Sequence, residues 1–239
     1  MRVLAGTSGY AFKEWKGSFY PETLADDGLL GFYASRLPAV EINNTFYRMP
    51  RERVLLSWAE QVPPGFRFAL KASQRITHQH RLQGAEESLA YFLRIASALG
   101  ERLGPTLFQL PPNLKQDLPR LEAFLQLLPR RWKAAFEFRH PTWFVEATWE
   151  ALAKAGAALC VAEGDDLESP LVATAPWGYV RLHRAAYPAE ALRAWAERIR
   201  RQPWEEAYVF FKHEGAESGP GAAARFLALV NGEREAPNG

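Results

Sequence analysis

Cysteine is almost absent from this sequence, which holds a single one, Cys160, among its 239 residues. A lone cysteine excludes an intrachain disulfide and fits a reducing compartment. Cys160 stands inside an apolar run, where a thiol behaves as a small hydrophobic side chain. We therefore interpret Cys160 as a core residue and not as a nucleophile.

The sequence also lacks a long apolar run and a strong charge of one sign. No apolar stretch approaches the roughly 18 residues that a membrane helix needs, and the first residues lead into a strand-like run instead of a targeting segment. The net charge is only +2 and the pI is 8.7, which is not typical of a protein that coats nucleic acid or a membrane. We expect a soluble, cytoplasmic protein with no membrane partner, whose recognition of anions is local.

What the sequence does contain is a regular alternation of extended and helical patterns. Eight short apolar runs are typical of buried strands, and most of the gaps between them carry apolar residues at helical spacing. This alternation indicates parallel βαβ units, and eight such units close as a barrel. We predict a single-domain (β/α)8 TIM barrel over residues 1–239. Its predicted strands are Val3–Ser8, Ala39–Thr45, Arg67–Ala72, Pro105–Leu110, Lys133–Arg139, Ala157–Glu163, Gly178–His183 and Ala207–Lys212.

Two segments depart from the regular pattern. The gap between the sixth and seventh predicted strands contains Gly164, Pro170 and Pro176 and has little room for a helix. We therefore predict that the sixth helix is abbreviated to a loop or a single turn. Residues 231–239 are polar and end in Ala-Pro-Asn-Gly, so we predict a frayed tail there.

The alternation of side chains along a strand indicates which residues point into the barrel. In Phe136-Glu137-Phe138-Arg139 the two phenylalanines belong under helices, which directs Glu137 and Arg139 into the lumen. A TIM barrel collects its chemistry at the C-terminal ends of its strands. We therefore predict a polar mouth there, and its lumen-facing candidates are Glu41, Asn43, Lys71, Gln109, Glu137, Arg139, Arg181, His183 and Lys212.

One strand end and the loops that follow other strands add four further candidates for ligand binding. Ser8 ends the first strand beside a glycine that lets the backbone approach a ligand. His78 and Arg81 belong to a polar loop after the third strand, where a His-x-His spacing without a third ligand is weak support for a metal. His140 precedes a proline and either orients the strand end through a local hydrogen bond or contacts the ligand directly.

Long motifs run through most of the chain. They are Gly6-Thr7-Ser8-Gly9-Tyr10, Trp15-Lys16-Gly17-Ser18-Phe19-Tyr20-Pro21, Glu41-Ile42-Asn43-Asn44-Thr45-Phe46-Tyr47-Arg48-Met49-Pro50, Phe68-Ala69-Leu70-Lys71-Ala72, Phe108-Gln109-Leu110-Pro111-Pro112, Glu137-Phe138-Arg139-His140 and Tyr179-Val180-Arg181-Leu182-His183. In these motifs the chain resembles the YecE-like family, the bacterial and archaeal domain of unknown function 72. The resemblance implies a TIM barrel distantly related to the sugar isomerase and endonuclease type barrels, and it brings no established reaction.

The chain departs from this family after the eighth strand. Similar proteins tend to carry a pair of asparagines there, whereas this chain has Lys212-His213. No role of those asparagines transfers to this chain, although a cation at this position suits a phosphate group.

The charges of the predicted mouth indicate an anionic ligand, because four cations face only two carboxylates. Our leading hypothesis is an enzyme that binds a phosphorylated or acidic sugar-like molecule and needs no metal cofactor. In it Glu137 and His183 exchange protons as base and acid, and Glu41 orients a hydroxyl group. The ligand-binding cations would be Lys71, Arg139, Arg181 and Lys212.

Three alternatives remain open at the level of sequence. The charges alone can form a self-satisfied ion network. The same cations can hold an anionic metabolite, or less favourably a nucleic-acid backbone, without turnover. Finally, Mn²⁺ or Zn²⁺ can assist sugar isomerisation or phosphodiester cleavage, although Arg139 and Lys71 would repel the ion. The ligands of that metal would be Glu41, Glu137, Glu163 and His183.

Overall fold

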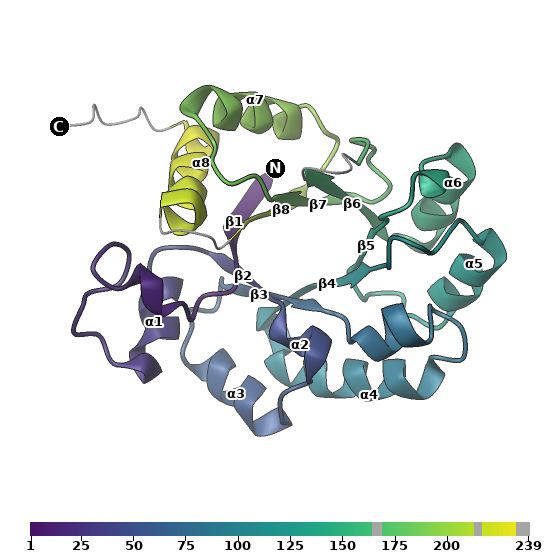
Figure 1. The fold of residues 1–239 in the computed structure, drawn as a ribbon, viewed down its shortest axis with the longest axis horizontal. Coiled ribbons are helices and arrows are strands. Elements are labelled where there is room, and N and C mark those ends of the chain that lie inside the picture. Colours follow the sequence, from purple (N-terminus) through teal and green to yellow (C-terminus); the bar gives the residue numbers. More distant parts are fainter. Residues whose placement is uncertain (164–168, 213–216, 233–239) are drawn as a thin grey trace.

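Eight parallel strands form a closed barrel in chain order (Figure 1). The structure is a computed structural model that describes residues 1–163, 169–212 and 217–232. Each strand pairs with its sequence neighbour, and β1 closes the ring by pairing with β8. The predicted (β/α)8 barrel is therefore confirmed. The strands are β1 Arg2–Ser8, β2 Ala39–Ile42, β3 Arg67–Lys71, β4 Leu103–Gln109, β5 Ala134–Glu137, β6 Ala158–Glu163, β7 Trp177–Leu182 and β8 Glu206–Phe211.

The predicted strands agree with the observed ones except at some ends, and two of the differences, at the ends of β2 and β5, lie at the barrel mouth. The prediction carried these strands to Thr45 and Arg139, whereas the ladder ends at Ile42 and Glu137. After β2 the chain turns into the short helix α2, Asn44–Tyr47, because the Thr45 hydroxyl donates to the carbonyl groups of Ile42 at 3.0 Å and Lys71 at 2.6 Å. The residues just after the ladder therefore lie on the barrel mouth.

Helices surround the barrel and cover its outer surface (Figure 1). Their apolar stripes are buried against the strands, as in α7, where Leu192, Trp195 and Ile199 have at most 3% of their surface exposed. Asp117 caps α5 by accepting from the backbone N–H of Arg120 at 3.1 Å. The helices are α1 Leu29–Ala34, α3 Glu52–Glu60, α4 Glu86–Ala96, α5 Leu118–Gln126, α6 Glu146–Ala155, α7 Ala189–Arg200 and α8 Ala222–Asn231, with short 3₁₀ turns at Lys13–Trp15, Asp26–Gly28, Ser97–Arg102 and Pro141–Trp143 and π-helical turns at Arg75–Gln79 and Glu217–Gly221.

The two segments predicted to be irregular have different outcomes. Between β6 and β7, the described residues 169–176 contain no helix, in keeping with an abbreviated sixth unit, and residues 164–168 lie outside the described part. The predicted tail begins too early, because α8 includes Asn231 and Gly232 ends it with a left-handed φ of 77°. Residues 233–239 of that tail lie outside the described part. Within the described ranges, no helix is long and apolar enough to cross a membrane.

Two apolar layers stabilise the barrel, one under the helices and one in the lumen. The lumen is filled unevenly. Strands β2, β3, β5 and β6 contribute alanines, while β7 and β8 contribute large aromatic rings, among them Tyr179 and Phe210, whose centroids are 5.3 Å apart. Cys160 is fully buried in this layer, which confirms that it is a core residue. The lumen residues are Leu4, Ala39, Ala69, Leu107, Ala135, Ala158, Cys160, Trp177, Tyr179, Tyr208 and Phe210.

Candidate functional site

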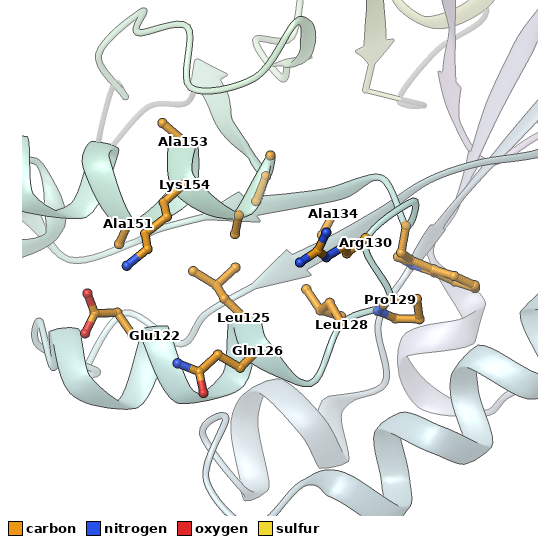
Figure 2. A pocket seen from close by; sticks show the side chains of 14 residues that line it. Glu122, Leu125, Gln126, Leu128, Pro129, Arg130, Ala134, Ala151, Ala153 and Lys154 are labelled. Carbon is orange, nitrogen blue, oxygen red and sulfur yellow. The ribbon is translucent and has the colours of Figure 1, made fainter.

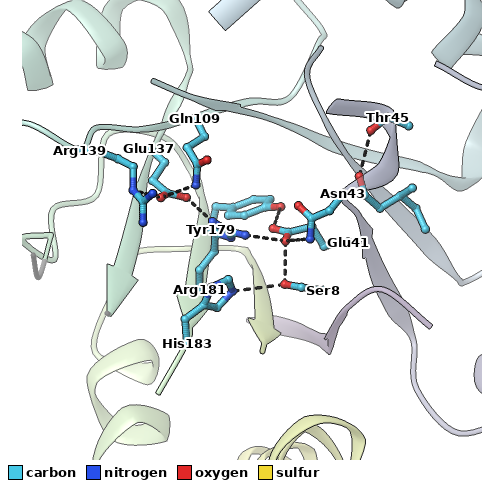
Figure 3. A network of polar contacts seen from close by, with 11 residues as sticks. Ser8, Glu41, Asn43, Thr45, Gln109, Glu137, Arg139, Tyr179, Arg181 and His183 are labelled. Carbon is cyan, nitrogen blue, oxygen red and sulfur yellow. Dashed lines mark hydrogen bonds and ion pairs between the residues drawn. The ribbon is translucent and has the colours of Figure 1, made fainter. Parts of the chain in front are cut away.

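Two buried carboxylates share one arginine in the upper lumen (Figure 3). Glu41, at the end of β2, accepts from Nη2 of Arg181 at 3.0 Å, and Glu137, at the end of β5, accepts from Nη1 at 2.5 Å. The three residues have at most 5% of their surface exposed. We call Glu41, Arg181 and Glu137 the charged triad. Strand alternation predicts their convergence, and the structure brings them together.

Neighbouring side chains occupy the remaining positions around Glu41. Its Oε1 accepts from the Ser8 hydroxyl at 2.7 Å and from Nδ2 of Asn43 at 3.1 Å, and its Oε2 accepts from the Tyr179 hydroxyl at 2.7 Å. Sequence reasoning missed Tyr179 because it stands in an apolar run, although it lies two residues before Arg181 and therefore on the same face of β7. These bonds fix the orientation of the Glu41 carboxylate.

Glu137 is held in a similar way on the opposite side of the lumen. Its Oε1 accepts from Nε2 of Gln109 at 2.7 Å and lies 3.4 Å from Nε of Arg139. The Arg139 side chain is 54% exposed, so its guanidinium extends from the buried triad toward solvent. Gln109 and Arg139 thus lie at the site as predicted. Of these two residues, Gln109 is buried and Arg139 is exposed to solvent.

The charged triad stays ionised at neutral pH. Burial alone would raise the pKa of Glu41, but Arg181, then His183 and the hydrogen bonds from Ser8 and Tyr179, lower it to about 2. Burial opposes ionisation of Glu137 as well, and Arg181 followed by Arg139 nevertheless lowers its pKa. The two carboxylates in turn overcome the effect of burial on Arg181 and raise its pKa.

His183 lies beside the triad as a neutral imidazole. Burial, and then the positive charge of Arg181, lower its pKa to about 3. Its Nε2 lies 3.3 Å from the Ser8 hydroxyl oxygen, and that hydroxyl already donates its proton to Glu41. The tautomer assigned by this geometry carries the proton on Nε2 and leaves the Nδ1 lone pair as the acceptor.

Lys71, at the end of β3, is the half-buried amine of the mouth. Its Nζ lies 4.3 Å from the centroid of the Phe46 ring, and among the described residues no carboxylate oxygen comes within salt-bridge distance. Burial, followed by Arg181, lowers the pKa of Lys71 to about 8. Sequence reasoning missed Phe46 because it lies just beyond the predicted strand Ala39–Thr45, in the unpredicted helix α2.

The remaining predicted candidates lie around this centre. Lys212 directly follows β8, is half-buried, and its positive charge contributes to the lowered pKa of His183. His78 contacts the edge of the Phe46 ring at 4.9 Å between centroids, and its own pKa is lowered by burial and then by Lys71. Both residues therefore border the mouth.

Two loop candidates make contacts of their own. Nη2 of Arg81 lies 3.5 Å from Oδ1 of Asn113, at the limit of a hydrogen bond, and Arg81 has a left-handed φ of 51°. Nδ1 of His140 accepts from the Thr142 backbone N–H at 3.3 Å and lies 2.9 Å from its hydroxyl. His140 therefore has the local, orienting contact that was one of its two predicted roles.

Glu163 does not join the other three residues of the predicted metal set. Its side chain accepts from the Tyr187 hydroxyl at 2.6 Å and from Nε1 of Trp195 at 3.2 Å, and it pairs with Arg184 at 2.7 Å. The reason is strand alternation, because Cys160 faces the lumen and Glu163, three residues later, faces α7. In the part of the chain that the structure describes, no three His, Cys, Asp or Glu side chains are grouped to hold a metal ion.

A separate cavity of about 710 Å³ lies at the other end of the barrel (Figure 2). It opens between the C-terminal ends of α5 and α6, and residues such as Leu125, Leu128, Ala151 and Ala155 give it a largely apolar lining. Lys154, Glu122 and Arg130 stand around it without forming a titratable cluster. The chemistry-bearing residues therefore lie at the mouth and not in this cavity.

Comparison with known sequences shows what this chain is similar to. The family described as "Protein of unknown function DUF72" matches residues 4–238. UPF0759 protein YecE of Escherichia coli strain K12 is 36% identical over 119 residues, 49% of this chain and 44% of that protein. UPF0759 protein YunF of Bacillus subtilis strain 168 is 29% identical over 142 residues, 56% and 50% of the two chains. The chain thus matches about half the length of these curated relatives.

Solved structures agree with the barrel. A DUF72 family protein from Thermotoga maritima superposes with a TM-score of 0.83 at 28% identity, covering 97% of this chain and 100% of the other. A D-psicose 3-epimerase, crystallised in the presence of D-fructose, superposes with a TM-score of 0.54 at 9% identity, covering 96% and 95% of the two chains. At that identity the second likeness concerns the fold alone.

Proposed function

Because this chain belongs to the DUF72 family, whose description gives no reaction, we propose a function from its barrel mouth: it binds a small anionic, sugar-like molecule and acts on it as an enzyme through metal-free acid–base chemistry. The fold is a TIM barrel similar to that of a sugar epimerase. The ligand class and the reaction are inferred from the charges and hydrogen-bonding groups of the site.

The observation that carries the proposal is the difference in charge between the buried layer of the barrel lumen and the rim above it. The deep layer is the charged triad, in which one guanidinium is bonded to both carboxylates. Above it the side chains of Lys71, Arg139 and Lys212 add three cations, while His183 is neutral. Counted over the described residues, the rim therefore has an excess of positive charge, which attracts a phosphate or carboxylate group.

Polar groups beside the triad suit a ligand that carries hydroxyl groups. Asn43 donates its amide N–H to Glu41, while its Oδ1 is buried without a hydrogen-bond partner among the described residues. A buried acceptor of this kind is costly unless something donates to it. A hydroxyl of the ligand would supply that bond, and the Glu41 carboxylate next to it would help to orient the same group.

Glu137 and His183 are the proposed proton-transfer pair. In the resting site Glu137 is ionised and His183 is a neutral imidazole with an available lone pair, so both can accept a proton from the ligand. Arg181 acts differently from the sequence hypothesis, in which it bound the ligand. Its two terminal nitrogens are already bonded to carboxylates, so we assign it the positioning of both acids.

A divalent metal fits these residues poorly. Glu41 and Glu137 each bond to Arg181, so an ion would have to displace a buried guanidinium and enter beside Lys71 and Arg139. Glu163, the fourth ligand of the predicted set, faces α7. Elemental analysis of protein purified without chelators or a metal-affinity tag tests this inference, and one tightly bound Mn or Zn per chain would contradict it.

Titration calorimetry with inorganic phosphate, followed by a panel of sugar phosphates and sugar acids, tests the binding step. Arg139→Gln removes a charge at the mouth, and Arg201→Gln is the matched control because Arg201 is 81% exposed at the end of α7. We expect Arg139→Gln alone to weaken binding by roughly 10-fold or more, since hydrogen bonds to charged groups contribute about 1.5–3 kcal/mol. Equal affinities of the two variants would contradict the proposal.

A second variant separates catalysis from binding. Glu137→Gln keeps the shape of the side chain and removes its ability to accept a proton, so turnover of a substrate identified in the panel should be lost. Binding of that substrate should survive, because the rim cations are unchanged. If turnover persists in Glu137→Gln, Glu137 is not the base, and another residue must accept the proton.

A further inference from the structure

Lys71 stands apart from other lysines whose contacts the structure describes. Lys133 pairs with Glu206, and Lys16 pairs with Asp26 at 3.1 Å. The Lys71 ammonium instead lies against an aromatic face, with no hydrogen-bond or carboxylate partner among the described residues. It is also half-buried at a strand end where the proposed ligand would bind. The Lys71 amine is therefore reached by solvent and is not fixed by a carboxylate of the described residues.

The groups around Lys71 do not stabilise its charged form as an ion pair would. The carboxylates that attract it, Glu41 and Glu137, are both bonded to Arg181. Arg181 and Arg139 repel its positive charge. On the loop side, the positive charge of Lys71 in turn contributes to the lowered pKa of His78. The surroundings thus lower the pKa of Lys71 to about 8, although the face of Phe46 attracts the charged form.

The consequence is a nucleophile at neutral pH. With a pKa lowered to about 8, Lys71 carries a free lone pair at neutral pH far more often than an ordinary lysine does. Lysines made neutral in this way are known to attack carbonyl groups. A cation kept only for binding a phosphate would gain nothing from the loss of its charge.

We propose that Lys71 is the covalent nucleophile of the site and forms an iminium with the carbonyl carbon of an anionic sugar-like aldehyde or ketone. The inference rests on the proposed function and narrows its substrate class to compounds with a free carbonyl group. Arg139 and Lys212 would hold the anionic group. The face of Phe46 shields one side of the amine from water.

The step balances without any further reactant. The amine lone pair attacks the carbonyl carbon, the C=O π electrons move to oxygen, and a proton passes from nitrogen to that oxygen to give a carbinolamine. Addition of one proton from solvent lets the oxygen leave as water, and the C=N⁺ bond forms. The positive nitrogen then acidifies the neighbouring C–H, whose proton Glu137 or His183 can remove.

Reductive trapping tests the proposal with two probes that carry both a carbonyl and a phosphate: pyridoxal phosphate and dihydroxyacetone phosphate. The intact protein is incubated with each probe, reduced with sodium borohydride, digested and mapped by mass spectrometry. We expect one adduct per chain, on Lys71, with an incorporation rate that rises with pH around a midpoint near 8. Lys71→Arg and Lys71→Met should lose it, whereas Lys115→Arg, at an exposed lysine, should keep it.

The outcomes separate this inference from the proposed function. If phosphate binds by calorimetry but neither probe marks Lys71, the covalent role is wrong and the anion site stands. If phosphate does not bind and no adduct forms, both are wrong. Adducts spread over exposed lysines at equal rates in wild type and Lys71→Met would also overturn the inference. Thermal unfolding of Lys71→Met checks that the variant is folded.

Discussion

Replacing Arg181 by Met removes the cation that is bonded to both Glu41 and Glu137. The side chain volume is largely kept, so the change acts through charge and not through a cavity. The variant leaves two carboxylates with at most 2% exposure in the upper lumen without their shared partner. Such buried charge costs free energy, because water does not reach either carboxylate and the contact of Arg139 with Glu137 at 3.4 Å is the cationic contact described for the pair in the absence of Arg181.

The magnitude follows from two independent considerations. Removing one partner of a buried ion pair typically destabilises a protein by about 3–5 kcal/mol. The pKa of Glu41, lowered from 4.5 to about 2, corresponds to about 3 kcal/mol of stabilisation of the ionised form. For a domain of this size such a loss lowers the melting temperature by roughly 6–20 °C.

The pH dependence of stability should change sign in the variant. In wild type, the Glu41 contribution is complete above about pH 4.5 and is lost as the pH falls toward 2, because the folded state binds fewer protons than the unfolded state. In Arg181→Met we expect burial, the largest effect on the pKa of Glu41, to outweigh the hydrogen bonds from Ser8 and Tyr179, so that the folded state binds more protons. Stability of the variant should therefore increase as the pH falls from 7 to 5.

Urea denaturation at pH 7, 6 and 5 measures this effect. The triple variant Arg181→Met, Glu41→Gln, Glu137→Gln should be more stable at pH 7 than Arg181→Met alone, and Arg181→Lys should recover part of the loss. If Arg181→Met does not fold, the triple variant and Arg181→Lys still give the comparison. A single variant as stable as wild type, or with a parallel pH profile, would refute the reasoning.

Three further predictions concern single groups. The imidazole of His183, with a pKa of about 3, should show no change in its NMR chemical shifts between pH 8 and pH 5, and the signals are assigned by their loss in His183→Gln; a titration near pH 6.5 would contradict the structure. Glu163→Gln should reduce stability to urea by about 1–2 kcal/mol, because Tyr187 and Trp195 lose a charged acceptor, and should leave phosphate affinity unchanged; a loss of affinity would place Glu163 in the site after all. Cys160 is fully buried, and burial raises the pKa of its thiol, so iodoacetamide at pH 8 should label it only after unfolding; rapid labelling of the native protein would show that the lumen is open.

Strand alternation was sufficient to predict the centre of the site. Glu137 and Arg181 each stand between large apolar residues, and the only arrangement that buries those residues under helices turns the charges into the lumen. The end of each strand was harder to predict, because it depends on a hydrogen bond. Thr45 bonds to Lys71 across 26 residues and thereby ends β2 early, which brings Phe46 under the Lys71 amine.

Two other differences have separate physical causes. The prediction of Glu163 as a metal ligand in the lumen was avoidable from the sequence. Side chains alternate along β6, so if Cys160 faces the lumen, Glu163 faces the helices. The contact between Tyr179 and Glu41 could not be predicted, because the two residues are 138 positions apart and meet only when the barrel closes with its particular stagger. The local sequence pattern therefore predicts whether a side chain points into the lumen or toward the helices. Which side chain it contacts there depends on how the barrel closes.

The uneven filling of the lumen has a consequence for how this barrel can diverge. Alanines from one half of the ring leave room that Tyr179 and Phe210 occupy from the other half, so these two rings form the floor beneath the polar layer. Tyr179 is tied to Glu41 by its hydroxyl, whereas the Phe210 ring is bound only by packing. A smaller residue at position 210 would deepen the mouth without altering a charged group. Larger ligands could thus be accommodated during evolution or design by changing the depth of the barrel while its charged residues stay in place.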